Sequence, residues 1–366
     1  MKKIFVISAI ALAVLTGCAA EQRAAVDNLV TQQVAGEVLA SPNDKRAYKT
    51  LLLPNKVEVM LVSDPDAQKS AAALSVGVGL LQDPMSQQGM AHYLEHMLFK
   101  GTDKYGSLDW SKEKVELEKI DALYEQYNST KDEVQRKAIY KKIDSVSGVA
   151  AKYAIANEYD KMMSAMGAQG TNAFTSFEQT VYTDDVPSAS LDKYLAVQAE
   201  RFRNPVLRIF HTELEAVYEE KNRTLDNDGR KVSETLFSNL FQKHNYGLQT
   251  TIGTVEHLKN PSLLEIRKYF NKYYVPNNMG IILSGDFNPD EVIAKVDKAF
   301  SYMQPKPFDK YTFQPEDAIT APIVKEIVGP DAENLTIGYR LPGNKDKDAL
   351  LADLVGQILT NGRAGL

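Results

Sequence analysis

The residues best suited to chemistry in this sequence lie in one short segment, His92-Tyr93-Leu94-Glu95-His96. In a helix, side chains three and four positions apart point the same way, so this spacing would place His92, Glu95 and His96 on one face. Two neutral imidazoles can bind one zinc ion, and a carboxylate beside them can take a proton from zinc-bound water. The segment therefore predicts a zinc site with its own general base.

The same three residues could also share the solvated face of an ordinary helix by chance. Apolar residues next to them argue against this alternative, because Leu94 and Met97–Phe99 would bury much of the helix surface. Histidines packed into such a helix would need polar partners. Gly89 before the segment and Gly101 after it are suited to limit the helix.

A catalytic zinc ion needs a third protein ligand, and its fourth position stays open for water. The best candidate lies on a second amphipathic segment, His211–Asn222, with the sequence HTELEAVYEEKN. Glu213 and Glu220 would share one face of this helix, whereas Glu219 would lie about 100° away from Glu220. Taken alone, such a segment is more often an acidic surface helix. The need for a third ligand favours a metal-binding role here.

Four motifs, in a fixed order, resemble one known family. They are HYLEHMLFKGT, GAQGTNAFTSFEQTVY, ELEAVYEEK and YFNKYYVPNNMGIILSGDFNPDEV. Together they cover most of residues 47–300, and the first contains the inverted H-x-x-E-H order of zinc peptidases. The chain resembles the N-terminal half of a protein of the pitrilysin/insulysin family of zinc metallopeptidases.

The resemblance implies a role for each matching residue. It implies one Zn²⁺ per chain, bound by His92, His96 and Glu220. It makes Glu95 the general base and Glu213 a supporting acid near the site. A strand bordering the substrate would carry Asn172, Ala173 and Thr175.

Strand and helix signals are mixed without strict βαβ alternation, which predicts an α+β fold. The resemblance implies a mixed sheet packed with helices over residues 46–304 and the beginning of a second, similar domain at 316–366. The prolines at 305, 307 and 315 predict a linker at 305–315 between them. In that second domain we expect a strand at Asn334–Tyr339 and a helix at Lys347–Leu359. Proteins of the family usually continue further, so a missing C-terminal half, in the same or another chain, is an expected partner.

The stretch between the two candidate metal segments is longer than the family pattern, and the excess lies at about 106–166. Apolar residues recur there at helical spacing, as in Leu117, Ile120 and Tyr124. Asn128-Ser129-Thr130 would form a turn, with Thr130 as a candidate N-cap. We therefore expect an inserted helical hairpin, which is either a solvated decoration or a lid or rest for the substrate.

The N-terminus has the features of a secretory signal. Lys2 and Lys3 precede an apolar run from Ile4 to Val14, and Leu15-Thr16-Gly17-Cys18 resembles a bacterial lipobox. We expect residues 1–17 to be removed, Cys18 to carry a lipid that holds the protein at a membrane, and residues 18–45 to form a tether. The expected location is the bacterial cell envelope, on the periplasmic face of the outer membrane.

Composition narrows the remaining classes of function. A formal net charge of −6 argues against nucleic acid as a partner, and Cys18 is the only cysteine, so disulfides within the chain are excluded. We expect a zinc endopeptidase that hydrolyses peptides or unfolded polypeptides in the cell envelope. The rivals are a noncatalytic family member, acting as a partner subunit or peptide-binding module, and a structural lipoprotein. Outside the motif, His211 is expected at the surface, and His244 and His257 are expected to be structural or exposed.

Overall fold

The computed structural model describes residues 32–33 and 46–359. The signal segment, Cys18 and most of the expected tether lie outside them. The chain divides into two compact units, which are described separately below. The first comprises Met1–Lys221 and Gln249–Thr312, and the second comprises Asn222–Leu248 and Phe313–Leu366. Residues 222–248, placed in the first domain by sequence, are thus grouped with the C-terminal segment.

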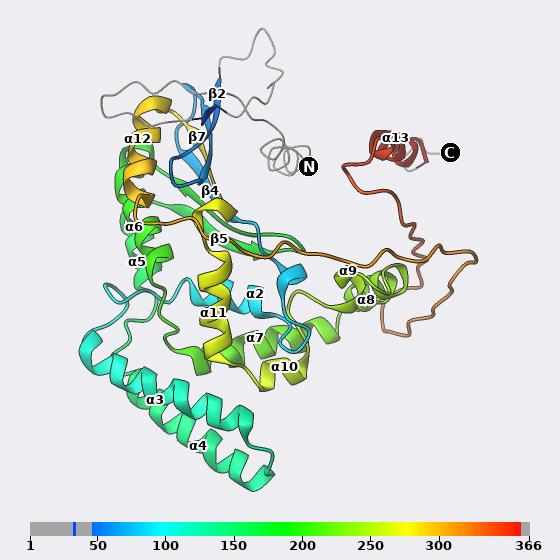
Figure 1. The fold of residues 1–366 in the computed structure, drawn as a ribbon, viewed down its shortest axis with the longest axis horizontal. Helices are drawn as coiled ribbons and strands as arrows, with labels where there is room; N and C mark the ends of the chain where they lie inside the picture. The colour runs from blue at the N-terminus through cyan, green and yellow to red at the C-terminus, as the bar shows by residue number, and fades with distance from the viewer. Residues whose placement is uncertain (1–31, 34–45, 360–366) are drawn as a thin grey trace. The chain divides into compact units, whose positions relative to one another are not determined.

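Strands of the first unit form one mixed sheet, in the order β1-β2-β3-β7-β4-β6-β5 among the described residues (Figure 1). The strands are β1 Gln32–Gln33, β2 Ala47–Leu52, β3 Glu58–Ser63, β4 Ser70–Val76, β5 Gln169–Thr175, β6 Thr180–Val186 and β7 Met279–Gly285. Neighbours are antiparallel except β3 and β7, which run parallel. Side chains of β4 and β7 alternate in burial, with Leu74, Ile281 and Leu283 fully buried. The expected α+β class is confirmed.

Helices pack on this sheet. Those of the first unit are α2 Met90–Met97, α3 Trp110–Ser129, α4 Glu133–Ala150, α5 Glu158–Ala165, α6 Leu191–Arg203, α7 Phe210–Leu225, α10 Val255–Lys259, α11 Leu263–Tyr273 and α12 Pro289–Phe300, with α7 ending in the second unit. Short 3-10 helices span Leu80–Gln82, Ser188–Ser190 and Pro276–Asn278. Helices α6 and α12 pack side by side, and α2 lies against β5 and β6 (Figure 1).

The expected helical hairpin is present as α3 and α4 (Figure 1). Thr130 does not cap the second helix, contrary to expectation. It ends α3, where its hydroxyl donates to the Gln126 carbonyl, and the Asp132 carboxylate caps α4 instead. An ionised carboxylate is a strong acceptor for the free N–H groups of a helix start, so Asp132 is a suitable N-cap.

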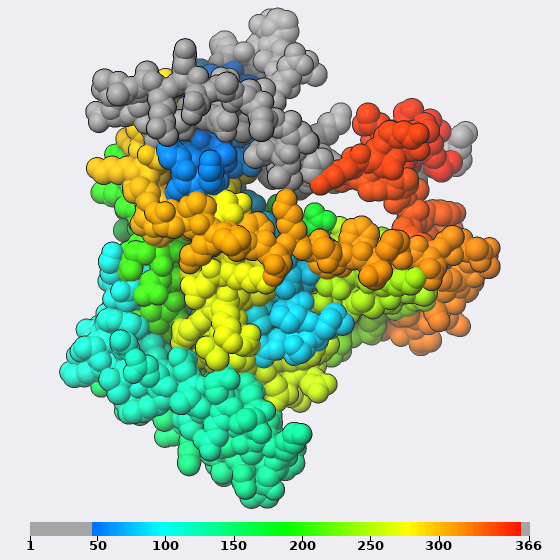
Figure 2. Space-filling model, in the orientation of Figure 1, coloured from blue at the N-terminus to red at the C-terminus, as the bar shows by residue number. Residues whose placement is uncertain are grey.

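Polar contacts fasten the hairpin to the segment that leads into α11, and Figure 2 shows its teal surface adjoining the yellow surface of α11. Asn128 donates to the Pro261 carbonyl at 2.6 Å, and Ser262 donates to the Glu125 carboxylate at 2.8 Å. Arg267 adds hydrogen bonds of 2.7 and 2.8 Å to Asp121. These bonds come from the C-terminal half of α3, so they hold the part of the hairpin near its turn.

A buried ion pair anchors the other end of the hairpin beneath the loop that follows α2. Arg208 donates through Nε and Nη2 to the two carboxylate oxygens of Glu113, at 2.6 and 2.9 Å, and both side chains are almost wholly buried. Its remaining N–H groups reach the carbonyls of Lys100 and Thr102, at 2.7 and 3.0 Å. Because the bidentate geometry satisfies both charges, the pair can persist in the interior and fixes where α3 begins.

The second unit contains α8 Asp228–Leu240, α9 Asn245–Leu248 and α13 Ala349–Leu359. The Glu316 carboxylate accepts the backbone N–H groups of Lys243 and His244, each at 2.7 Å, which ties the segment after Phe313 to α8 and α9. The strand expected at Asn334–Tyr339 is absent, because no described strand lies beside this segment to pair with it.

Many apolar side chains of the second unit are exposed. They are Ile323, Val324, Val328, Leu335, Ile337, Tyr339, Leu341, Leu350, Leu351, Leu354, Val355, Ile358 and Leu359. No described helix, α13 included, combines the length and the apolar character that a membrane span requires. A run of exposed apolar residues of this length is typical of a surface that another polypeptide covers.

Candidate metal centre

Helix α2 is held at its N-terminus by a buried carboxylate. Asp83 accepts the backbone N–H groups of Gly89 and Ala91, at 2.8 and 2.9 Å, which occupies donors that a helix start leaves free. Burial raises the pKa of Asp83 to about 7, although these hydrogen bonds act to lower it. Gly89 has φ of 84°, and a Cβ there would lie 2.5 Å from the Ile252 carbonyl, so only glycine fits.

Three of the four predicted residues lie on α2, and α7 supplies the fourth. His92 Nε2 lies 3.8 Å from Glu220 Oε1, and His96 Nε2 lies 3.7 Å from Glu220 Oε2. The two imidazole rings meet edge to face, with centroids 4.8 Å apart. One ligand atom from each of these three residues lies within 4.8 Å of the others. The structure therefore brings together the three predicted ligands.

The geometry of this cluster fits a zinc ion. Two imidazole nitrogens and one carboxylate oxygen form a donor set known from catalytic zinc sites. Three atoms bound tetrahedrally at about 2.1 Å from one ion would be about 3.4 Å apart. The nitrogen-to-oxygen distances of 3.7 and 3.8 Å run to different oxygens of Glu220, and one ligand atom from each of the three residues lies within 4.8 Å of the others. Rotations of His92, His96 and Glu220 would therefore have to shorten these separations for one ion to be held.

The predicted supporting acid contacts the candidate metal ligand His96 directly. Glu213 Oε2 lies 3.5 Å from His96 Nδ1, and Glu213 Oε1 forms an ion pair with Lys100 Nζ at 2.7 Å. Burial alone would raise the pKa of Glu213, but the contacts with His96 and Lys100 outweigh burial and lower it. An ionised Glu213 orients the Nδ1 side of the His96 ring toward itself and leaves Nε2 toward Glu220. Sequence reasoning missed Lys100, which lies just after α2.

Glu95 lies beside the ligands and is held by a residue from β5. The Thr175 hydroxyl donates to Glu95 Oε2 at 2.6 Å, and only 7% of Glu95 is exposed. Burial raises the pKa of Glu95, while the hydrogen bond from Thr175 and the charge of His96 oppose that rise. A partly desolvated carboxylate with a raised pKa is a better proton acceptor than an exposed one.

The predicted substrate strand is the edge of the sheet nearest α2. Among the described residues, β5 pairs with β6 and with no other strand. Asn172 is exposed and Ala173 half-buried, so the backbone of β5 presents an unpaired edge on the side away from β6. An extended peptide can add to such an edge through main-chain hydrogen bonds. Thr175, predicted only to border the substrate, instead directs its hydroxyl to the candidate base.

A family profile described as "Insulinase (Peptidase family M16)" matches residues 58–136 and 147–254. The chain belongs to peptidase family M16. A second profile, described as "Peptidase M16 inactive domain", matches residues 262–365. All of the residues gathered at the metal centre lie within the first match, which confirms the resemblance found in the sequence and identifies the family as one of metallopeptidases.

Relatives of this M16 chain are longer than the chain itself. Mouse insulin-degrading enzyme is 29% identical over 315 residues, covering 82% of this chain but 26% of that enzyme. The zinc protease PqqE of Helicobacter pylori is 28% identical over 254 residues, or 67% of this chain and 56% of the relative. The solved structure of pitrilysin superposes with a TM-score of 0.57 at 24% identity, covering 81% of this chain and 26% of pitrilysin. The solved structure of a protease from Helicobacter pylori superposes with a TM-score of 0.55 at 23% identity, covering 73% of this chain and 53% of that protease.

A buried arginine of the M16 chain lies close to the end of α2. Nothing in the sequence except its charge marked this arginine as part of the site. Arg201 donates to the Leu98 carbonyl and to the Tyr159 hydroxyl, each at 3.0 Å, and lies over the rings of Phe99 and Tyr182, at 4.1 and 4.3 Å. A cation at the C-terminal end of α2 stabilises that helix. The same charge acts to lower the pKa of Glu95.

The remaining histidines of the M16 chain serve packing. His211 is buried, contrary to expectation, because the hairpin covers it: its Nδ1 lies 2.9 Å from the Tyr124 hydroxyl, and its ring packs against Tyr140. His257 accepts the backbone N–H of Gln88 at 3.3 Å. His244 is buried within the second unit.

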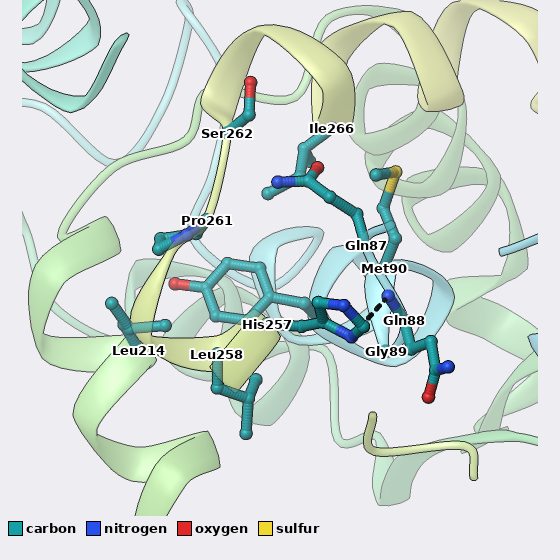
Figure 3. A pocket seen from close by; sticks show the side chains of 11 residues that line it. Gln87, Gln88, Gly89, Met90, Leu214, His257, Leu258, Pro261, Ser262 and Ile266 are labelled. Carbon is teal, nitrogen blue, oxygen red and sulfur yellow. Dashed lines mark hydrogen bonds between the residues drawn. The ribbon is translucent and has the colours of Figure 1, made fainter. Parts of the chain in front are cut away.

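A small pocket opens at the start of α2, separate from the metal centre (Figure 3). His257 lines it, together with side chains from α2, α7, α10 and α11, including Met90, Leu214 and Ile266 (Figure 3). Its volume of about 30 Å³ matches the space of a single water molecule. This volume is too small to hold a substrate peptide. None of the candidate zinc ligands lines the pocket, so it also lies in the wrong place for one.

Proposed function

We propose that this chain supplies the zinc-binding, catalytic half of an endopeptidase that hydrolyses peptides or unfolded polypeptides. The observation that carries the proposal is the convergence of His92, His96 and Glu220, with Glu95 fixed beside them. The names of relatives support it, since PqqE is a zinc protease and others are insulin-degrading enzymes. This chain matches 26% of mouse insulin-degrading enzyme and 56% of PqqE.

The residues of the site divide the chemical work between them. A zinc ion held by His92, His96 and Glu220 would supply Lewis-acid activation of water and of the scissile carbonyl. Glu95 accepts a proton from the attacking water and passes it to the leaving amine. The free edge of β5 holds the peptide extended, so that the scissile bond lies next to Glu95.

A noncatalytic member of the family, acting as a partner subunit or a peptide-binding module, is the alternative. It is favoured by the match of residues 262–365 to a domain described as inactive. That match does not include any of the four residues of the metal centre, whose types and arrangement are complete for a zinc peptidase. The catalytic proposal is therefore the stronger of the two.

Zinc content and peptide cleavage, measured on the same sample, test the proposal. The chain is expected to bind one zinc ion, and a quenched fluorogenic peptide is expected to be cleaved slowly. Chelation should stop cleavage and added zinc should restore it. The relatives extend well beyond the part that this chain matches. Turnover should rise when a polypeptide corresponding to their C-terminal remainder is supplied, because closure around the substrate positions the peptide and excludes water. A zinc-loaded sample that cleaves no peptide even with such a polypeptide would favour the noncatalytic alternative.

We also propose that Cys18 carries a lipid that holds the protein at the bacterial cell envelope, on the periplasmic face of the outer membrane. The support is the basic start, the short apolar run and the lipobox-like Leu15-Thr16-Gly17-Cys18. In a bacterial host, Cys18→Ser should move the protein from the membrane fraction to the soluble fraction and abolish labelling by a radioactive fatty acid. Unchanged membrane association of that variant would contradict the assignment.

A further inference from the structure

We propose that Thr175 is a positioning residue for the general base, and that it couples the substrate strand β5 to Glu95. The inference rests on the proposed peptidase function and adds a residue to it. Sequence reasoning placed Thr175 only along the border of the substrate. Three features of the structure assign it a more specific role: its bond to Glu95, the support of that bond from β6, and a second tie at the other end of β5.

The first feature is the bond itself. Thr175 Oγ1 donates to Glu95 Oε2 at 2.6 Å, a length typical of a hydroxyl bound to an ionised carboxylate. Such a bond is stronger than a neutral one and fixes the rotation of the carboxylate plane. With Oε2 held by Thr175, Oε1 is the oxygen that takes the proton from the attacking water. A base held at one oxygen is already oriented before substrate binds.

The second feature is that Thr175 is itself held in place. Thr175 pairs with Thr180 at the end of the β5–β6 ladder, and their hydroxyl oxygens lie 3.5 Å apart. Thr180 is completely buried and donates to the Val78 carbonyl at 2.9 Å. The turn that follows is closed by a 2.8 Å bond from Ser176 N–H to the Gln179 carbonyl. Threonine is also restricted at χ1, so its hydroxyl has few alternative directions.

The third feature lies four residues earlier on the same face of β5. Thr171 donates to the buried Asp184 carboxylate at 2.7 Å, and Tyr194 donates to the same carboxylate at 3.1 Å. Strand β5 is therefore tied through side chains at both ends, while the backbone edge of residues 172–174 remains available for a peptide. A peptide bound to that edge takes its position from the same strand that positions Glu95. Thr175 thus links the position of a peptide along β5 to the position of the Glu95 carboxylate.

This role makes a specific kinetic prediction for Thr175→Val, which keeps the shape of the side chain but removes the donor. The turnover number should fall about 10- to 100-fold, since a misplaced catalytic group costs that much. KM should change less than about twofold, because the backbone edge of β5 is unaltered. Zinc affinity, measured by chelator competition, should be unchanged. Thr175→Ser should recover most of the lost turnover, since serine retains the donor.

A matched control is Thr50→Val, which changes a threonine of β2 in the same sheet, separated from β5 by four other strands. It should leave turnover within about twofold, as expected for a strand substitution outside the site. If Thr175→Val and Thr50→Val were equally active, the role of Thr175 would be overturned. If Thr175→Val raised KM instead, Thr175 would act only by shaping the strand, and the proposal would also fail.

A second measurement does not require activity. Thermal unfolding of the zinc-free protein can be followed for Thr175→Val, Glu95→Leu and the double variant. If the two side chains bond to each other, the double variant should melt above the midpoint obtained by adding the two single shifts. Additive shifts would overturn the contact on which the inference rests. Absence of cleavage by the unaltered, zinc-loaded protein would count against the proposed function, whereas normal turnover of Thr175→Val would count only against this role.

Discussion

Replacing Glu95 with glutamine is expected to abolish peptide cleavage while leaving zinc bound. Glutamine has almost the same shape and still accepts the hydrogen bond from Thr175, but its amide cannot take a proton from water. Glu95 is not among the three residues whose ligand atoms converge, so removal of its charge leaves the donor set complete. Loss of a general base lowers turnover by about 10² to 10⁴.

Metal analysis beside a fluorogenic peptide assay measures both parts of this expectation. Glu118→Gln is a suitable control, because Glu118 is an exposed glutamate of α3 whose contact is an exposed ion pair with Lys114. That control should retain normal turnover and zinc content. Near-normal turnover of Glu95→Gln would show that another group acts as the base. Loss of zinc from Glu95→Gln would instead show that Glu95 is a ligand.

Glu220→Gln is expected to weaken zinc binding severely, whereas the change next to it, Glu219→Gln, should not. The two carboxylate oxygens of Glu220 lie 3.7 and 3.8 Å from imidazole nitrogens of His96 and His92. Glu219 is exposed and turned away from this cluster by the pitch of α7. Substitution of a residue that only supports a metal ligand lowers metal affinity about 10- to 100-fold. Loss of a ligand itself should lower zinc affinity at least as much.

Competition with a chelator of known affinity gives the zinc dissociation constant of both variants. Glu219→Gln is a matched control, since it removes the same charge from the same helix one position away. The opposite ranking of the two variants would move the third ligand to Glu219 and break the alignment of α7 with the family motif.

Local patterns predicted the parts of the site that depend on one helix at a time. The spacing of His92, Glu95 and His96 fixed their shared face on α2, and the seven-residue spacing placed Glu213 and Glu220 on the same side of α7. Helical periodicity in the insertion also predicted α3 and α4. Such periodicities follow from the geometry of an isolated helix, so no knowledge of the tertiary fold is needed.

Contacts between elements could not be predicted in this way. The bond from Thr175 to Glu95 depends on how the β5–β6 register meets α2, and the pair of Lys100 with Glu213 depends on how α2 meets α7. The burial of His211 could not be predicted, because it depends on the hairpin α3–α4 packing over this part of α7. The amphipathic pattern of α7 alone does not indicate that a second element packs on it. The missing strand at 334–339 shows the same limit, because β-propensity becomes a strand only where a partner strand exists.

The division of the ligands between α2 and α7 also has a consequence for the order of events as the protein forms. Helix α2 has eight residues, too few to be stable alone in water. Glu220 is synthesised only after the hairpin and the β5–β6 ladder, and it meets the histidines only when α7 docks. The complete set of three ligands therefore exists only once α7 has docked beside α2. Zinc held by all three would bind the folded chain and not the unfolded one, so it would add to the free energy of unfolding.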